Sequence, residues 1–190
     1  MNGDEVIALF EKTGALLDGH FIYASGRHGR RFLQASRVLQ FPNDTERLCK
    51  ALAAQFADSP PDLVVGPATG GIILAYETAR HLNCRAAFTE KEDGGMALKR
   101  GFRIAPGERV LVVEDIITTG GSVKKTIDHL RARGADIIGV GGLIDRSGGN
   151  ASFDVPFKAL ATLHFDSYAP EAVPEDLAAI PTSEPDDLVL

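Results

Sequence analysis

RVLVVEDIITTGGS, residues 109–122, is the stretch of this sequence from which the fold can be argued. Its apolar run at 110–113 has the length and the β-branched content of a strand buried on both faces. Glu114 and Asp115 follow directly, and a loop of threonine and glycine then leads to apolar residues at helical spacing, with Ser122 as the expected N-cap. This order predicts a strand, an acidic pair, a glycine-rich loop and a helix.

The loop at 118–122 has the features of a phosphate site. Its free backbone N–H groups, its hydroxyls and the positive end of the following helix all favour an anion. Glu114 and Asp115 would repel a phosphate, so they should face ribose hydroxyls or a Mg²⁺ ion shared with a pyrophosphate. A phosphorylated sugar would satisfy both halves of the stretch. The plainer alternative is a buried strand that ends in a polar turn and a capped helix.

The remaining composition argues against several function classes. No GxxxxGK[ST] P-loop occurs, and the glycines at 139–144 lack the third glycine of a dinucleotide fingerprint. The net charge of −6 comes from residues 171–190, which hold six acidic residues and no lysine or arginine, so the body of the chain is neutral. A neutral body with an acidic tail has no electrostatic footprint for nucleic acid or for an anionic membrane.

The expected location of the protein is the cytoplasm. The first residues, MNGDEVIALFEK, are acidic and lack the apolar run of a signal peptide, and no stretch approaches the roughly 18 apolar residues of a membrane span. Cys49 and Cys84 are too few for a disulfide framework or a metal cluster. We therefore expect both cysteines to be small buried hydrophobes in a reduced compartment.

Strands and helices alternate along residues 62–165, which predicts a parallel α/β sheet with helices on both faces. The first unit is a strand at 62–66, a loop with the sequence PATGG and a helix that runs to residue 82. Further strands are expected at 85–88, 136–144 and 157–164. Helices are also expected at 4–17 with Asp4 as cap, at 43–56 with Asn43 and Glu46 as a capping box, and after the central loop as far as Gly134.

Two segments carry a resemblance to a known family. The sequence EDIITTGGS at 114–122 resembles the phosphoribosyl pyrophosphate (PRPP) signature of the type I phosphoribosyltransferases, in which two acids and two hydrophobes precede a Thr/Gly loop. The segment 21–32 resembles the N-terminal segment of the orotate phosphoribosyltransferases, because Phe21 and the run at 25–27 match the pattern Phe-x-x-x-Ser-Gly-Arg. The lysine that many members carry before this run is Ala24 here.

The resemblance implies the type I phosphoribosyltransferase fold, an α/β fold with a parallel sheet flanked by helices and a small N-terminal hood. Residues 1–170 would form a single domain, with the N-terminal helix and hood at 1–42 and the α/β core at 43–170. Residues 171–190 would be an acidic, proline-rich tail that wraps the surface. The implied reaction transfers ribose 5-phosphate from PRPP to orotate and yields orotidine 5′-phosphate and pyrophosphate.

The resemblance also implies which residues bind the two substrates. Arg146 follows the strand at 136–144, at the strand end where open α/β sheets bind ligands, and it matches the arginine that meets the pyrimidine in the family. The other expected orotate-binding residues are Thr118, Arg27 and Phe32. The expected PRPP-binding residues come from the acidic pair and the two glycine loops: Glu114, Asp115, Ile116, Ile117, Thr118, Thr119, Gly120, Gly121, Ser122, Ala68, Thr69 and Gly70.

A mobile lid is expected at residues 89–103, which are polar, contain glycines and are too many for a simple connection. A closing flap would protect an oxocarbenium-like transition state from water. The Lys-Asp-His-Gly run of many orotate enzymes is absent from this loop. The candidate cations for the leaving pyrophosphate are Lys91, Lys99 and Arg100, and Asp115 completes the candidate catalytic residues.

The implied cofactor is Mg²⁺, held mainly by substrate oxygens and water, so no residue is assigned as a protein ligand of a metal. The implied assembly is a homodimer in which the lid completes the neighbouring site. Two alternatives stay open. One is a phosphoribosyltransferase for a purine base, although Arg27 and Arg146 favour a base with a carboxylate. The other is a non-catalytic PRPP-binding regulator, against which the neutral body counts.

Overall fold

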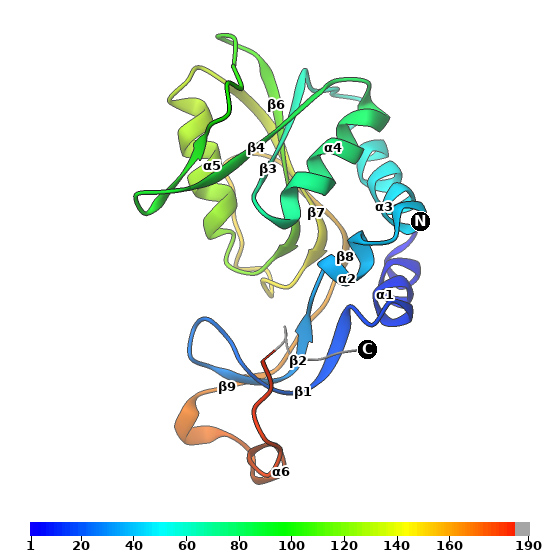
Figure 1. Cartoon of the computed structure of the whole chain (residues 1–190), viewed down its shortest axis with the longest axis vertical. Coiled ribbons are helices and arrows are strands. Elements are labelled where there is room, and N and C mark those ends of the chain that lie inside the picture. The colour runs from blue at the N-terminus through cyan, green and yellow to red at the C-terminus, as the bar shows by residue number, and fades with distance from the viewer. Residues whose placement is uncertain (185–190) are drawn as a thin grey trace.

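Six strands form the central sheet of the computed structural model, which describes residues 1–184 of the chain (Figure 1). The strand order is β5-β4-β3-β6-β7-β8, and every neighbouring pair is parallel except the β4–β5 hairpin. The expected parallel α/β sheet is therefore confirmed. The strands of this sheet are β3 (Leu63–Pro67), β4 (Arg85–Glu92), β5 (Gly95–Leu98), β6 (Arg109–Ile117), β7 (Asp136–Asp145) and β8 (Phe157–Thr162).

Helices cover both faces of this sheet, with α3 and α4 on one face and α5 on the other (Figure 1). Alternate side chains of β6 point to the two layers. Leu111 and Val113 belong to the core cluster with α3 and α4, whereas Val110 and Val112 belong to the cluster with α5. The helices are α1 (Gly3–Lys12), α2 (Ser36–Leu39), α3 (Pro42–Ala54), α4 (Gly70–Leu82), α5 (Gly121–Arg131) and α6 (Glu175–Ala178).

A second, antiparallel sheet forms the hood at the carboxyl ends of the core strands (Figure 1). It consists of β1 (Leu16–Ile22), β2 (His28–Leu33) and β9 (Ser167–Tyr168), and Gly29 of β2 lies opposite Ser167 of β9. The hood is thus built from segments that lie before and after the core strands. Residues 167–168, which the sequence interpretation assigned to the α/β core, belong to the hood sheet.

Helix α1 differs from its prediction at both ends. Its cap is Asn2 and not Asp4: the Asn2 side chain accepts the Glu5 N–H at 2.9 Å, and the Glu5 carboxylate accepts the Asn2 N–H at 2.8 Å. The predicted last residue, Leu17, is instead part of β1, where it pairs with Phe32. The apolar residues that suggested one long helix therefore serve two elements.

Helix α3 also begins one residue earlier than predicted. Its cap is Phe41, without a side-chain hydrogen bond, and Pro42 occupies the first turn. Proline suits this position because its missing N–H and fixed φ cost nothing there. The capping box predicted for Asn43 and Glu46 is therefore wrong. None of the helices in residues 1–184 has the length and apolar character needed to cross a membrane.

The first part of the tail lies against the hood, as expected for a segment that wraps the surface (Figure 1). It contains a 3₁₀ helix, η1 (Pro170–Ala172), and the short α6, from which Leu177 is fully buried. The carboxylate of Asp176 forms an ion pair with Arg30 of β2 at 2.6 Å. Two of the tail's acidic residues, Asp186 and Asp187, lie outside the described residues.

Candidate active site at the carboxyl edge of the sheet

The acidic pair lies inside strand β6, not in the loop after it, because β6 continues to Ile117. Neighbouring residues of a strand point to opposite faces of the sheet. Asp115 accordingly lies against the start of α4, while Glu114 borders a hollow of about 70 Å³ with residues 116–123. One carboxyl group therefore faces each glycine loop.

The loop at 68–70 meets Asp115 directly. A Cβ atom on Gly70 would lie 2.0 Å from Oδ2 of Asp115, so only glycine fits at this contact. The other oxygen, Oδ1, accepts the N–H of Ile116 at 2.7 Å. The peptide bond between Ala68 and Thr69 is cis, and the Ala68 N–H donates to the Thr89 carbonyl at 2.7 Å. The fold thus brings together two loops that are separate in the sequence.

Both carboxyl groups have raised pKa values. Burial is the main cause for Glu114, the negative charge of Asp115 adds to it, and together they raise the pKa of Glu114 from 4.5 to about 9. Burial also raises the pKa of Asp115. Neither carboxylate forms an ion pair with a cation of residues 1–184. A ligand with hydroxyl groups or positive charge could therefore supply the partners that these two carboxyl groups lack.

The loop between β6 and α5 closes on a left-handed residue. Gly120 has φ of +71° and is the N-cap of α5, so the predicted cap at Ser122 is wrong. A Cβ atom on Gly120 would also meet the Phe153 ring at 2.8 Å. The Gly121 N–H donates to Oγ1 of Thr119 at 3.3 Å. Backbone N–H groups at the start of an 11-residue helix and nearby hydroxyls thus gather at one point, which suits a phosphate.

The predicted lid is a hairpin of β4 and β5 that ends near this loop. A cavity of about 470 Å³ lies between the two and is bordered by residues 91–96 of the hairpin and by Thr119, Gly121, Ser122 and Lys125. Lys91 lines this cavity and forms no ion pair with any of the described residues. Lys125, which also lines it, was missed in the sequence because lysine on a helix is usually an ordinary surface residue.

The other two lid cations are engaged elsewhere. The ammonium group of Lys99 lies 2.8 Å from a carboxylate oxygen of Glu92. Nε and Nη2 of Arg100 donate to the two carboxylate oxygens of Glu90 at 2.9 and 2.8 Å. The backbone N–H of Leu98 donates to Nε2 of His129 at 2.9 Å, which ties the end of the hairpin to α5. Of the three predicted cations, only Lys91 borders the cavity beside the loop at 119–122.

Arg146 stands at the end of β7, opposite the hood. The backbone N–H of Arg146 donates to the carbonyl of Ile117 at 2.8 Å, and this bond places Arg146 beside the end of β6. Its guanidinium carbon lies 4.7 Å from the ring centre of Tyr23 and 5.2 Å from that of Phe165. These two aromatic residues were missed because no local pattern marks them, and only folding brings them to Arg146.

The two predicted hood residues have contacts within the hood. Nε of Arg27 donates to Oγ of Ser167 at 2.8 Å, and its Nη2 donates to the Ser167 carbonyl. The ring of Phe32 packs on Phe21, with their centres 5.6 Å apart. In this structure Arg27 therefore joins β9 to the β1–β2 turn, and Phe32 belongs to an aromatic pair.

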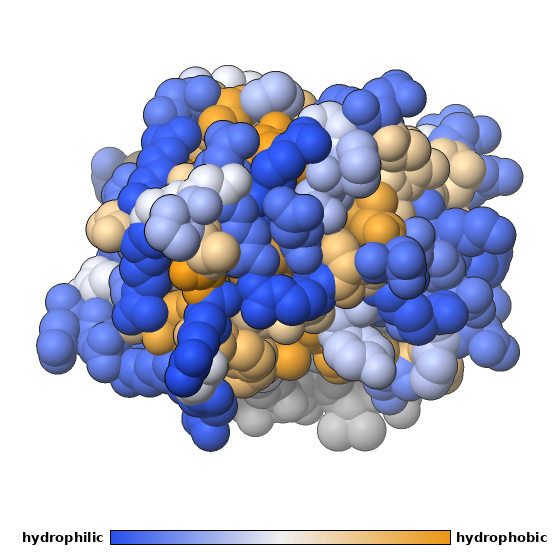
Figure 2. Space-filling model, turned by 90° about the horizontal axis from the view of Figure 1, so that it is seen from above, coloured by the Kyte–Doolittle hydropathy of each residue, from blue (hydrophilic) through white to orange (hydrophobic). Residues whose placement is uncertain are grey.

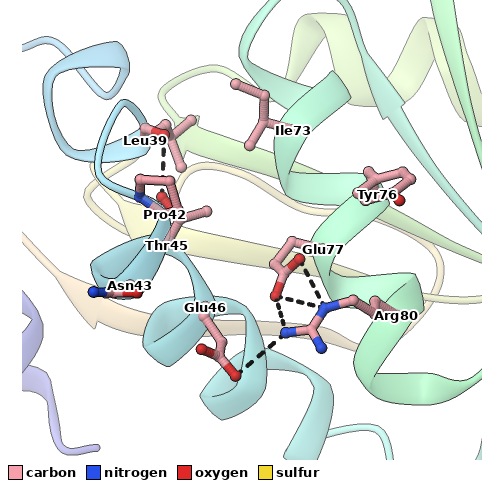
Figure 3. Close-up of a pocket in the computed structure, with 9 residues that line it drawn as sticks. All are labelled: Leu39, Pro42, Asn43, Thr45, Glu46, Ile73, Tyr76, Glu77 and Arg80. Atoms are coloured by element: carbon pink, nitrogen blue, oxygen red, sulfur yellow. Dashed lines mark hydrogen bonds and ion pairs between the residues drawn. The ribbon is translucent and has the colours of Figure 1, made fainter.

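Two further hollows lie outside this site. One, of about 360 Å³, lies between α3 and α4 (Figure 3). In it, Arg80 forms ion pairs with Glu46 and Glu77. The apolar side chains of Ile73 and Tyr76 at its border are 49% and 68% exposed. The other lies at the amino ends of the strands and contains the paired Arg85 and Glu108. Figure 2 shows the molecule from that end, where hydrophilic residues predominate.

Comparisons with known proteins agree with this geometry. A family model for the phosphoribosyl transferase domain matches residues 36–168. The chain is 48% identical over 185 residues to the orotate phosphoribosyltransferase of Caldicellulosiruptor bescii, and 51% identical over 185 residues to that of Pelotomaculum thermopropionicum. Each alignment covers 97% of this chain and 97% of the relative.

Solved structures show the same architecture. The orotate phosphoribosyltransferase of Aeropyrum pernix superposes with a TM-score of 0.71 at 27% identity, over 83% of this chain and 93% of that one. An adenine phosphoribosyltransferase of Rhodothermus marinus reaches a TM-score of 0.64 at 23% identity, over 83% and 99% of the two chains. The fold is therefore shared by proteins that are named for different bases, so the fold alone does not select the base.

Proposed function

The chain belongs to the orotate phosphoribosyltransferases of the phosphoribosyl transferase domain family, and we propose that it transfers ribose 5-phosphate from PRPP to orotate in pyrimidine biosynthesis. The observation that carries the choice of base is the sequence identity of 45–51% over at least 93% of the chain to relatives of that name. The same membership supports a cytoplasmic enzyme, and the residue roles below rest on the geometry of the site.

The loop at 118–122 holds the 5′-phosphate of PRPP. Support comes from its position at the start of α5, where the hydroxyls of Thr118, Thr119 and Ser122 accompany backbone N–H groups, and from the turn at Gly120. Ile116 and Ile117 place this loop at the strand end. Glu114 and Asp115 hold the ribose hydroxyls, and their raised pKa values support a role in which the ligand supplies the missing polar partners.

The loop of Ala68, Thr69 and Gly70 holds the pyrophosphate, because it lies directly against Asp115. Bound Mg²⁺ would supply positive charge to the pyrophosphate oxygens. Residues 1–184 contain no group of three acidic, histidine or cysteine side chains that could hold a metal, whereas Glu114 and Asp115 offer two carboxylates beside the substrate. This donor set fits an ion held mostly by PRPP and water, with these two residues as its protein contact.

In the reaction, the bond from ribose C1 to the pyrophosphate oxygen breaks, C1 bonds to a ring nitrogen of orotate, and the proton of that nitrogen passes to the departing pyrophosphate or to water. The departing pyrophosphate takes the electron pair, so cations placed around it lower the barrier. Lys91 is the best placed of the lid residues, since it borders the cavity next to the loop. Lys99 and Arg100 would have to exchange Glu92 and Glu90 for the pyrophosphate when the lid closes.

Arg146 binds the carboxylate of orotate. It lies at the strand end nearest the loop, and its guanidinium has no carboxylate partner within residues 1–184. Thr118 lines the neighbouring hollow. Phe32 and Arg27 complete the hood side, although Arg27 would first have to leave Ser167.

The test is an assay of PRPP consumption with orotate, uracil, hypoxanthine, xanthine and adenine. We expect turnover with orotate, and we expect Arg146→Ala to raise the KM for orotate at least tenfold while the KM for PRPP stays within about twofold. Lys50→Ala, an exposed cation on α3, serves as control. Turnover with a purine base instead would favour the purine enzyme, and PRPP binding without turnover of any base would favour the regulator.

We also propose that the enzyme is a homodimer and that the outer face of α4 contacts the second copy. The large apolar side chains of Ile73 and Tyr76 are exposed beside the groove of Figure 3, and α4 begins at the pyrophosphate loop. A partner there would lie near the active site. Sedimentation should give a dimer for the wild type and a monomer for Tyr76→Glu, whereas an exposed change on α5, Asp128→Asn, should leave the dimer intact.

Mixing two inactive variants tests whether the lid completes the neighbouring site. One variant carries Asp115→Asn, and the other carries Lys91→Ala, Lys99→Ala and Arg100→Ala. If the lid acts on the neighbour, a mixed dimer has one intact site, so activity returns on mixing. If the lid acts on its own chain, as the cavity between Lys91 and Ser122 would allow, mixing restores nothing.

A further inference from the structure

Arg146 is held between parts of the chain that are far apart in sequence. Tyr23 comes from the turn between β1 and β2, and Phe165 follows β8. Their ring centres lie 4.7 and 5.2 Å from the guanidinium carbon, within the range of cation–π attraction. The backbone of Arg146 is fixed separately by its bond to the Ile117 carbonyl. The side chain is therefore oriented by the two rings, and the hydroxyl of Tyr23 also interacts with the guanidinium.

Arg146 differs from the arginines of the hood in the groups that its guanidinium contacts. Arg27 donates to Ser167, Arg30 pairs with Asp176 and Arg31 pairs with Asp18. Arg146 has no such acidic partner within residues 1–184, and its neighbours are aromatic. Aromatic rings hold a guanidinium without neutralising it, so its N–H groups keep their capacity for a bidentate bond to a carboxylate.

The ring of Tyr23 is itself fixed in place. Its hydroxyl donates to the carbonyl of Arg31 at 2.7 Å. The ring crosses β2 at Gly29, where an added Cβ would lie 2.0 Å from the Tyr23 oxygen and 2.4 Å from Cζ. Gly29 therefore provides the space in which Tyr23 lies flat against the strand. A residue with a side chain at 29 would displace the ring.

We infer that Tyr23 is a positioning residue for the base site: its ring orients the Arg146 guanidinium toward the carboxylate of orotate. This inference rests on the proposed function, and it deepens that function by assigning a part of the preference for a carboxylated pyrimidine to a residue of the hood. It also gives Gly29 a role, because the glycine leaves room for the tyrosine. The consequence is that orotate selection depends on the hood being closed against β7.

The test compares Tyr23→Leu with Tyr23→Phe. We expect Tyr23→Leu to raise the KM for orotate by roughly 3- to 30-fold, with kcat and the KM for PRPP within about twofold, because the ring contact orients only the base-side cation. Tyr23→Phe keeps the ring and should restore most of the orotate affinity. Ile22→Ala is the matched control, because Ile22 is the neighbouring residue of the same hairpin and is 53% exposed.

A double-mutant comparison separates this inference from the proposed function. In an Arg146→Ala background, Tyr23→Leu should cause no further rise in the KM for orotate. If Arg146→Ala itself leaves that KM unchanged, the proposed base contact is wrong. If Arg146→Ala raises it and Tyr23→Leu does not, only the role of Tyr23 is wrong. A Tyr23→Leu variant that raises both KM values equally and loses thermal stability would show a purely structural tyrosine.

Discussion

Two strand–loop–helix units meet at the active site, and they use the same order of elements for different purposes. In the β3–α4 unit, backbone packs on backbone: a Cβ on Gly66 would lie 2.2 Å from the Gly71 carbonyl oxygen. In the β6–α5 unit, the strand ends in two carboxyl groups with raised pKa values. In the first unit, the space between backbone atoms limits which residues fit. In the second unit, the burial of two carboxyl groups determines the chemistry.

This difference separates shape from chemistry in the PRPP site. The loop of the first unit is narrow because Gly70 and Gly71 let it approach both β3 and Asp115. In the second unit, Glu114 and Asp115 are buried away from water, and this burial costs stability until a ligand pairs with them. Substitutions of the glycines in the first unit should therefore affect folding, whereas substitutions of the two carboxyl groups in the second unit should affect binding and its pH dependence.

The largest effect is expected for Gly66→Ala. The new Cβ would meet the oxygen and the carbonyl carbon of Gly71 at 2.2 and 2.6 Å, and backbone atoms cannot turn aside as a side chain can. We expect the free energy of unfolding to fall by more than about 4 kcal/mol, measured by denaturant titration. Gly3→Ala, where the nearest atom lies at 3.6 Å, should change it by less than about 1 kcal/mol.

The next largest effect is expected for Asp115→Asn and Glu114→Gln. Each amide keeps the shape but cannot carry the charge that a ribose hydroxyl or Mg²⁺ requires, so kcat/KM for PRPP should fall by about 100-fold. Thermal stability should be unchanged or higher, because a neutral amide does not have to be kept protonated or ionised against the cost of burial. Asp128→Asn on the exposed face of α5 should alter neither. A large loss of stability in the two amide variants would contradict the electrostatic account of this unit.

A moderate effect is expected for Gly120→Ala, where φ is +71° and the Phe153 ring is 2.8 Å from an added Cβ. The left-handed backbone alone should cost about 1–2 kcal/mol, and displacement of the ring should raise the KM for PRPP. Gly107→Ala is the control for strain alone, because Gly107 has φ of +75° with no atom within 4 Å of the Cβ. Equal effects of the two substitutions on stability and KM would exclude a role for the Phe153 contact.

A pH dependence of stability should accompany these effects. Because the pKa of Glu114 rises from 4.5 to about 9 on folding, the folded protein holds this proton in a range where the unfolded chain has lost it. Stability should therefore decline as pH rises between about 4.5 and 9. In Glu114→Gln the decline of Tm with pH should be smaller. Each kcal/mol of stability that no longer depends on pH should appear as a difference of roughly 2–4 °C between the Tm values of the two proteins. Identical Tm profiles of the two proteins would contradict the raised pKa.

Much of this protein is determined by local sequence. The apolar run at 110–113 specifies a central strand because its side chains can be satisfied only by burial on both faces, and the alternation of such runs with helical patterns specifies the parallel sheet. The two glycine loops are also visible locally, since strand ends, glycines and hydroxyls are adjacent in the chain. The phosphate site expected at 118–122 could be predicted because these residue types are adjacent in the sequence.

Tertiary structure decided what depends on distant partners. Ser122 is a good capping residue, yet Gly120 is the N-cap of α5, because glycine readily takes the left-handed turn beside Phe153. The strand at 167–168 completes the hood because β2 has a free edge there. Arg146 could be found in the sequence, but its neighbour Tyr23 could not, because 4.7 Å in space corresponds to more than a hundred residues of chain and no local rule spans that separation.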